Sequence, residues 1–148
     1  MSYPLITNGI VLLTKKCNLK CDYCYETLTN DIMTLTTLKD IINILNDNAS
    51  QMGVIPKLNF FGGEPLLQFE DLIKPACQYA KELNPRFVLT ITTNGTLLTE
   101  EILNYFKFMN VNIMLSLDGH QQSHNLHRKY SDGKGSFEDI NNIIHVLL

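Results

Sequence analysis

Three cysteines, Cys17, Cys21 and Cys24, stand close together in a polar stretch of the chain. Thiolates are good ligands for zinc and for iron–sulfur clusters, and thiols at this spacing can reach one metal centre from a single loop. Structural zinc normally takes four protein ligands, and no fourth ligand follows at a zinc-finger spacing, so a zinc site here would be incomplete. A cubane cluster would keep one iron without a protein ligand, and an open iron is a place where a substrate or cofactor can bind.

The fourth cysteine, Cys77, falls within an apolar helical pattern, so we expect a buried thiol with no ligand role. The alternative for the other three, that they are unligated core residues, is disfavoured because free core cysteines are usually scattered rather than gathered in a polar loop. The spacing is also poor for a disulfide framework. A reducing compartment is therefore indicated, and we expect a cytoplasmic protein.

Apolar periodicity predicts the elements that must position this loop. Strands are predicted over residues 10–13, 58–61, 87–91 and 111–117. Helices are predicted through residues 38–45, 72–83, 102–109 and 140–147, with Thr99 as the N-cap of the third and Ser136 as the N-cap of the fourth. Pro75 is compatible with the second helix only near its first turn.

Strands that alternate with helices in this way predict a parallel sheet and an α/β fold of four βα units in one domain. Ligands of such folds sit at the carboxyl ends of the strands, so the chemistry is expected in the loops that follow them. These loops hold the three cysteines, then Gly62-Gly63-Glu64-Pro65, Thr92-Thr93-Asn94-Gly95 and Ser116-Leu117-Asp118-Gly119.

The composition suits a compact soluble domain and disfavours two classes of partner. Twelve Lys and Arg against fifteen Asp and Glu give a net charge of −3, so neither nucleic acid nor a membrane surface is expected as a partner. The apolar run at 10–13 is too short for a signal peptide or a membrane span.

The four loops together resemble those of the radical SAM superfamily, and most of all its SPASM-type branch of peptide and protein maturases, which includes the anaerobic sulfatase-maturating enzymes. The specific features are the CxxxCxxC spacing, with Tyr23 before the last cysteine, and the GGEP sequence after the second strand. The resemblance implies a TIM-like partial (βα)6 barrel, of which this chain supplies four units. Because the last helix is still apolar at Leu148, residues 1–148 are expected to be a truncated radical SAM core domain.

The resemblance also implies two cofactors. Cys17, Cys21 and Cys24 would hold three irons of a [4Fe–4S] cluster, and S-adenosylmethionine (SAM) would chelate the fourth. The enzyme would cleave SAM reductively to a 5′-deoxyadenosyl radical and modify a peptide or protein substrate, with an electron donor such as flavodoxin or ferredoxin. Lys15, Lys16 and Lys20 could attract an acidic donor of this kind, although exposed lysines are the default.

Several further residues correspond to the family's SAM contacts. The backbone of Tyr23 would face the adenine. Gly62 and Gly63 lack a Cβ and would let the backbone approach the methionine amino group, while Glu64 would anchor that turn. Asn94, Ser116 and Arg128 would lie near the ribose, the methionine portion and its carboxylate, in that order. The plain alternative for each of the glycine-containing segments is a tight turn.

Three histidines, His120, His124 and His127, could be mistaken for a metal cluster. Because the surrounding sequence is polar and offers little carboxylate support, a solvated loop is expected instead. His124 matches a histidine of the family pattern, whereas His120 and Asn125 depart from it at positions where proline and aspartate are common. A non-catalytic iron–sulfur module and a zinc-binding structural domain remain as alternatives to the enzyme.

Overall fold

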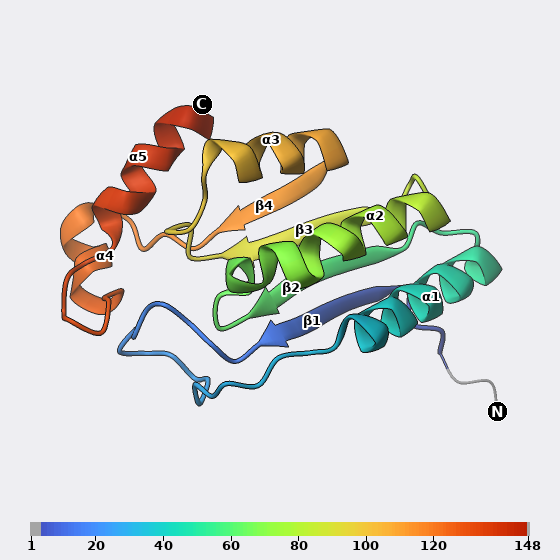
Figure 1. Cartoon of the computed structure of the whole chain (residues 1–148), viewed down its shortest axis with the longest axis horizontal. Coiled ribbons are helices and arrows are strands. Elements are labelled where there is room, and N and C mark those ends of the chain that lie inside the picture. The colour runs from blue at the N-terminus through green and yellow to red at the C-terminus, as the bar shows by residue number, and fades with distance from the viewer. Residues whose placement is uncertain (1–3, 148) are drawn as a thin grey trace.

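The computed structural model describes residues 4–147 and contains one four-stranded parallel sheet. Its strands are β1 (Asn8–Thr14), β2 (Lys57–Gly62), β3 (Val88–Thr93) and β4 (Val111–Leu115), in the spatial order β1-β2-β3-β4. All four point the same way, so their carboxyl ends meet at one edge (Figure 1). The predicted α/β class is confirmed. The expectation drawn from Leu148 concerns a residue outside the described range.

Three helices lie along one face of the sheet (Figure 1). They are α1 (Leu35–Met52), α2 (Lys74–Leu83) and α3 (Glu100–Met109). Pro75 is the second residue of α2, which agrees with its predicted place near the first turn of that helix. A 3-10 turn at Pro65–Gln68 and a π-helical turn at Phe69–Ile73, neither of which was predicted, lead into α2.

Two further helices, α4 (Gln121–His127) and α5 (Phe137–Leu147), stand at the carboxyl ends of the strands (Figure 1). The predicted polar loop after the fourth strand is therefore wrong over the residues of α4. That helix has no apolar stripe from which to predict it, since its one aliphatic side chain, Leu126, is exposed. The fourth strand also ends at Leu115, two residues earlier than predicted.

The helix ends show which caps were assigned correctly. Thr99 caps α3 as predicted, because its side chain accepts the N–H of Ile102 at 3.2 Å. Ser136 stands at the N-cap position of α5, as predicted, and its carbonyl accepts the N–H of Ile140 at 3.4 Å, but its hydroxyl makes no capping bond. Its hydroxyl lies against His124 and the Arg128 carbonyl, while the first N–H of α5, from Phe137, donates to Asn125 Oδ1 at 3.0 Å.

The core lies between the sheet and α1–α3. Its largest fully buried side chains come from both layers: Phe60, Phe87, Phe106, Leu13, Leu38, Ile42, Leu45, Leu58, Ile73, Leu89 and Ile91. On the opposite face of the sheet, Ile10 and Met114 remain 65% and 56% exposed. None of the helices described between residues 4 and 147 combines the length and apolar character needed to cross a membrane.

Candidate functional site

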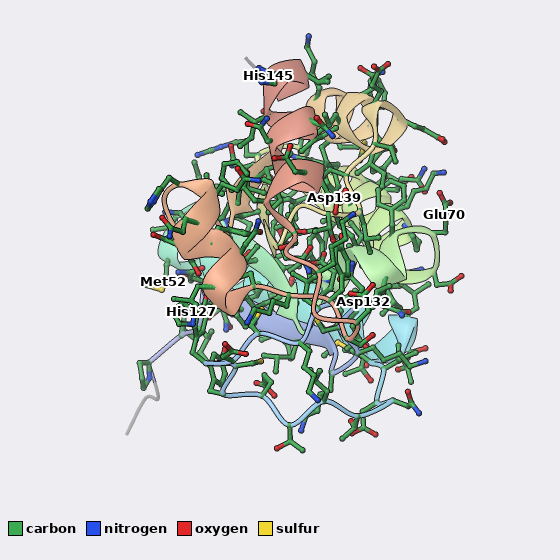
Figure 2. The ribbon with its side chains drawn as sticks, turned by 90° about the vertical axis from the view of Figure 1, so that its left-hand side faces the viewer. Met52, Glu70, His127, Asp132, Asp139 and His145 are labelled. Atoms are coloured by element: carbon green, nitrogen blue, oxygen red, sulfur yellow. The ribbon has the colours of Figure 1, made fainter. Side chains whose placement is uncertain are left out.

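One cavity opens at the carboxyl ends of the strands, the end that faces the viewer in Figure 2. It is lined by Cys17, Leu19, Cys21, Tyr23, Cys24, Tyr25, Glu26, Phe61, Gly62, Gly63, Thr92, Thr93, Asn94, Ser116 and Arg128. This set includes all three loop cysteines and every predicted SAM contact except Glu64. A larger hollow, of about 570 Å³, lies between α3, β4 and α5, but no thiol lines it.

The two glycines at the end of β2, Gly62 and Gly63, let the cysteine loop pass close to the strand end. A Cβ on Gly62 would lie 2.4 Å from the Thr14 carbonyl oxygen, and one on Gly63 would lie 2.2 Å from that of Lys16. The N–H of Gly63 donates to Thr14 O at 2.9 Å. In this structure the glycines are therefore required by the neighbouring backbone, and any approach of a ligand is an additional use of the same space.

Glu64 lies beneath the cavity, and its side chain is completely buried. Its carboxylate accepts hydrogen bonds from the backbone N–H groups of Leu66 (2.9 Å) and Asn94 (2.8 Å) and from the hydroxyl of Thr93 (2.7 Å). Burial raises the pKa of Glu64, and these three hydrogen bonds oppose that rise. Glu64 thus joins the ends of β2 and β3.

Asn94 connects the loop after β3 to the cysteine loop. Its amide nitrogen donates to Asn18 Oδ1 at 3.0 Å and lies 3.9 Å from Cys17 Sγ. Its oxygen accepts from the N–H of Thr96 at 3.0 Å, and the Thr96 hydroxyl accepts in turn from the Asn18 amide at 2.7 Å. Asn18 and Thr96 were not predicted as site residues, since an isolated polar residue carries no spacing signal. Together these residues fix the start of the cysteine loop.

The segment after α4 is hydrogen-bonded to the middle of the cysteine loop. The N–H of Lys20 donates to Lys129 O at 2.7 Å, and that of Asp22 donates to His127 O at 3.1 Å. The Asp22 carboxylate also lies 3.8 Å from Lys129 Nζ. Figure 2 labels His127, the last residue of α4, and Asp132, which lies in the segment that follows. Residues about a hundred positions apart therefore build the rim of the site together.

Arg128 forms an ion pair that the sequence did not reveal. Its Nε donates to Asp118 Oδ2 at 3.0 Å, and its guanidinium carbon lies 5.4 Å from the ring centroid of Tyr23. The Tyr23 hydroxyl donates to the same Asp118 oxygen. Burial alone would raise the pKa of Asp118, but these two hydrogen bonds outweigh it and lower that pKa. Burial and the bond to Asp118 raise the pKa of Tyr23 to about 12.

His124 contradicts the expectation of a solvated histidine loop, because it is completely buried. It contacts Ser136 Oγ through Nε2 at 2.9 Å and the N–H of Asp118 through Nδ1 at 3.3 Å. Burial and the nearby Arg128 lower its pKa. His120 is exposed and His127 half-buried, so the three histidines do not form a cluster.

The thiols differ in their surroundings. Burial raises the pKa of Cys17 and of Cys21, although Arg128 opposes the rise at Cys21. Cys24 is exposed at the mouth of the cavity. Cys77 is completely buried, which raises its pKa to about 12, as suits a core thiol.

The donor set fits an iron–sulfur cluster better than a single ion. Among the residues described, no three His, Cys, Asp or Glu side chains are gathered closely enough to hold one metal ion. A cubane needs each thiolate on a different iron, which suits three sulfurs spread around one cavity. Cys17, Cys21 and Cys24 are the residues that would hold it.

Comparison with known proteins agrees with this geometry. Residues 11–147 match the family model described as the Radical SAM superfamily. The chain is 31% identical over 145 residues to the cysteine-type anaerobic sulfatase-maturating enzyme of Clostridium novyi, covering 90% of this chain and 38% of that protein. An uncharacterized protein of Methanocaldococcus jannaschii is 33% identical over 141 residues, covering 93% and 47%.

Solved structures show the same similarity. The structure of native anSMEcpe with bound AdoMet and Cp18Cys peptide superposes with a TM-score of 0.83 at 25% identity, covering 95% of this chain and 39% of that one. The match over residues 11–147 shows that the chain belongs to the radical SAM superfamily, and its enzyme relatives make this a family of enzymes. The chain spans between about a third and a half of the length of these curated relatives.

Proposed function

We propose that this chain forms the cofactor-binding part of a radical SAM enzyme that modifies a peptide or protein in the cytoplasm. The observation that carries the proposal is the shared cavity, in which three thiols lie at one end of a parallel sheet with Arg128 and Ser116 beside them. A [4Fe–4S] cluster held there in reduced form would supply one electron for cleavage of the carbon–sulfur bond of the SAM sulfonium, which would give methionine and a 5′-deoxyadenosyl radical for hydrogen abstraction.

The residues of the chain bind and orient these groups. Cys17, Cys21 and Cys24 would bind the cluster as thiolates, whereas burial raises the pKa of Cys17 and Cys21 and so favours the neutral thiol in the metal-free chain. Arg128 supplies a guanidinium whose Nε donates to Asp118. Its two terminal nitrogens would then donate to the carboxylate of SAM. The Ser116 hydroxyl lines the same cavity and can donate to the methionine portion.

The substrate class in this proposal rests on the relatives. One similar solved structure holds a bound peptide, and two relatives are named as sulfatase-maturating enzymes, which points to a protein substrate. Electrons would come from a small acidic carrier such as a flavodoxin or ferredoxin. A second opening beside Cys17 is lined by Lys16, Leu28 and Leu67 among others. This opening supports access of the electron carrier to the cluster site from outside the SAM cavity.

The decisive experiment is anaerobic reconstitution of the full chain with iron and sulfide. The proposal expects about four irons and four sulfides per chain by the stoichiometry of the cluster. It also expects a reduced-cluster electron paramagnetic resonance (EPR) spectrum that changes when SAM is added, and 5′-deoxyadenosine formed under dithionite. Cys21→Ala, with one ligand fewer, is the matched control. A reconstituted cluster that neither senses nor cleaves SAM would contradict the proposal.

The alternatives give different outcomes in the same experiment. SAM binding without cleavage, under conditions in which a full-length relative cleaves, would indicate a non-catalytic cluster module. Zinc without iron or sulfide in anaerobically purified protein would indicate a structural zinc domain. For the substrate, mass spectrometry of the peptide encoded beside the gene, with and without co-expression, tests whether a residue is modified.

A further inference from the structure

We propose that His124 is a positioning residue that holds Arg128 and Asp118 in place from beneath the site. This inference rests on the proposed function, in which Arg128 binds the carboxylate of SAM. It concerns a side chain that lines no part of the cavity, because His124 is completely buried behind it.

A single neutral tautomer of His124 satisfies every hydrogen bond around the ring. Nδ1 accepts the backbone N–H of Asp118 at 3.3 Å, which leaves the proton on Nε2. Nε2 then donates to Ser136 Oγ at 2.9 Å, and the Ser136 hydroxyl donates onward to the carbonyl of Arg128 at 3.2 Å. The chain of hydrogen bonds therefore starts at the backbone of Asp118 and ends at the backbone of Arg128.

The two residues at the ends of this chain are the partners of the ion pair in the cavity. Asp118 Oδ2 receives Arg128 Nε at 3.0 Å. The N–H of Arg128 also donates to the backbone carbonyl of His124 at 2.8 Å, at the C-terminal end of α4, so the side chain and the backbone of His124 both bond to this ion pair's residues. A guanidinium can bind a carboxylate with two parallel hydrogen bonds only when its plane is held in the right orientation.

A catalytic role for the His124–Ser136 contact is excluded by burial. Both side chains have no exposed surface, so no substrate reaches the hydroxyl. A purely packing role is also insufficient, because an apolar residue of similar size would leave the Asp118 N–H without its acceptor and the buried Ser136 Oγ without its donor. The ring does pack edge-on against Phe137, with centroids 5.7 Å apart.

The charged groups around His124 favour the neutral ring that this arrangement needs. Arg128 lies on one side, and the Asp118 carboxylate is already paired with it. The acidic residues on the neighbouring helix α5 bond elsewhere, Glu138 with Gln121 and Asp139 with Tyr130. A protonated ring would instead place a second donor against the Asp118 N–H.

The first experiment measures SAM affinity by equilibrium dialysis on the reconstituted chain, in parallel with iron content and melting temperature. We expect His124→Leu to weaken SAM binding about tenfold, because both buried hydrogen bonds are lost. His124→Gln, which can keep one of them, should weaken it less. Iron content should be unchanged in both. The matched control is Leu45→Ala, on the buried face of α1, which lowers the melting temperature without changing the SAM dissociation constant.

The outcomes separate this inference from the proposed function. If the wild-type chain binds no SAM, the proposed function fails. If the wild type binds SAM and both folded His124 variants bind it equally well, only the positioning role fails.

A second measurement needs no cofactor, and it keeps the inference testable if the His124→Leu variant does not fold. Nitrogen-15 NMR of the metal-free wild-type chain should show His124 as the neutral Nε2–H tautomer at pH 7. A ring protonated on Nδ1 at that pH would overturn the inference, since Nδ1 could then not accept from Asp118.

Discussion

The carboxylate of Glu64 accepts the backbone N–H of Asn94 at 2.8 Å and thereby joins the end of β2 to the end of β3. The other carboxylate oxygen accepts from Leu66 and Thr93 in the same buried pocket. These bonds set the relative positions of the two loops that bring Gly63 and Asn94 to the cavity.

Glu64→Gln should therefore destabilise the fold although it conserves size. An amide nitrogen in place of either oxygen faces an existing donor, and a buried unsatisfied donor costs about 1 to 3 kcal/mol. The free energy of unfolding from urea titrations checks this. The control is Glu70→Gln, which removes an exposed ion pair with Lys74 and should cost about 0.5 kcal/mol or less. Equal losses for the two variants would show that Glu64 has no special role.

Gly63→Ala should destabilise the protein more than the same substitution at Gly119, a glycine with a positive φ. The added Cβ would lie 2.2 Å from a backbone oxygen, so the loop must move, and we expect a cost above about 2 kcal/mol. At Gly119, where φ is +69° and nothing lies within 4 Å of a Cβ, alanine should cost about 1 kcal/mol from backbone strain alone. Melting temperatures and reconstituted iron content compare the two. A harmless Gly63→Ala would contradict this account of the turn.

The cysteines should separate into ligands and a core residue. Cys21→Ala should abolish the cluster absorbance after reconstitution, because a ligand is lost. Cys77→Ala should keep full iron content and lose about 1 to 2 kcal/mol of stability, because it removes one buried atom from the core. Iron and sulfide assays with urea unfolding measure both effects. Loss of the cluster in the Cys77→Ala variant would contradict the assignment of Cys77 as a core residue.

Arg128→Lys should weaken SAM binding by about tenfold while sparing iron content. A lysine ammonium can bind Asp118 or the carboxylate of SAM, but it lacks the planar guanidinium with several donors that can bind both. It also cannot stack on the ring of Tyr23 as a guanidinium does. Equilibrium dialysis with labelled SAM gives the dissociation constant. Arg86→Lys, at an exposed site away from the cavity, is the control and should match wild type.

The stability of the fold should fall in mild acid because of His124. Burial and Arg128 lower its pKa below 6.5 in the folded chain, so the unfolded chain binds the proton first as the pH drops. The contribution of His124 to the free energy of unfolding is therefore complete above about pH 6.5. Below that pH the contribution is lost, by at most about 1.4 kcal/mol per pH unit. Urea unfolding at pH 7.5 and 5.5 should show a larger loss for wild type than for His124→Gln. Parallel losses would place the acid sensitivity elsewhere.

The sequence by itself determined the order of the four strands and of the helices α1, α2, α3 and α5, the cysteine loop after the first strand and the Thr99 cap of α3. These features depend on residues a few positions apart, since side-chain periodicity and capping are local properties. The burial of Cys77 was predicted on the same basis, from its place in an apolar helical pattern.

The tertiary structure alone decided how the loops meet. The pairing of Arg128 with Asp118 and the bond from Tyr23 to Asp118 join residues that no local pattern relates. The burial of His124 depends on α4, a short polar helix that contacts α5 through Gln121 with Glu138 and His124 with Phe137 and has no apolar stripe of its own. Such contacts form only when distant segments pack, so a cluster site could be predicted from the spacing of the cysteines, but the hydrogen-bond network around Arg128 could not.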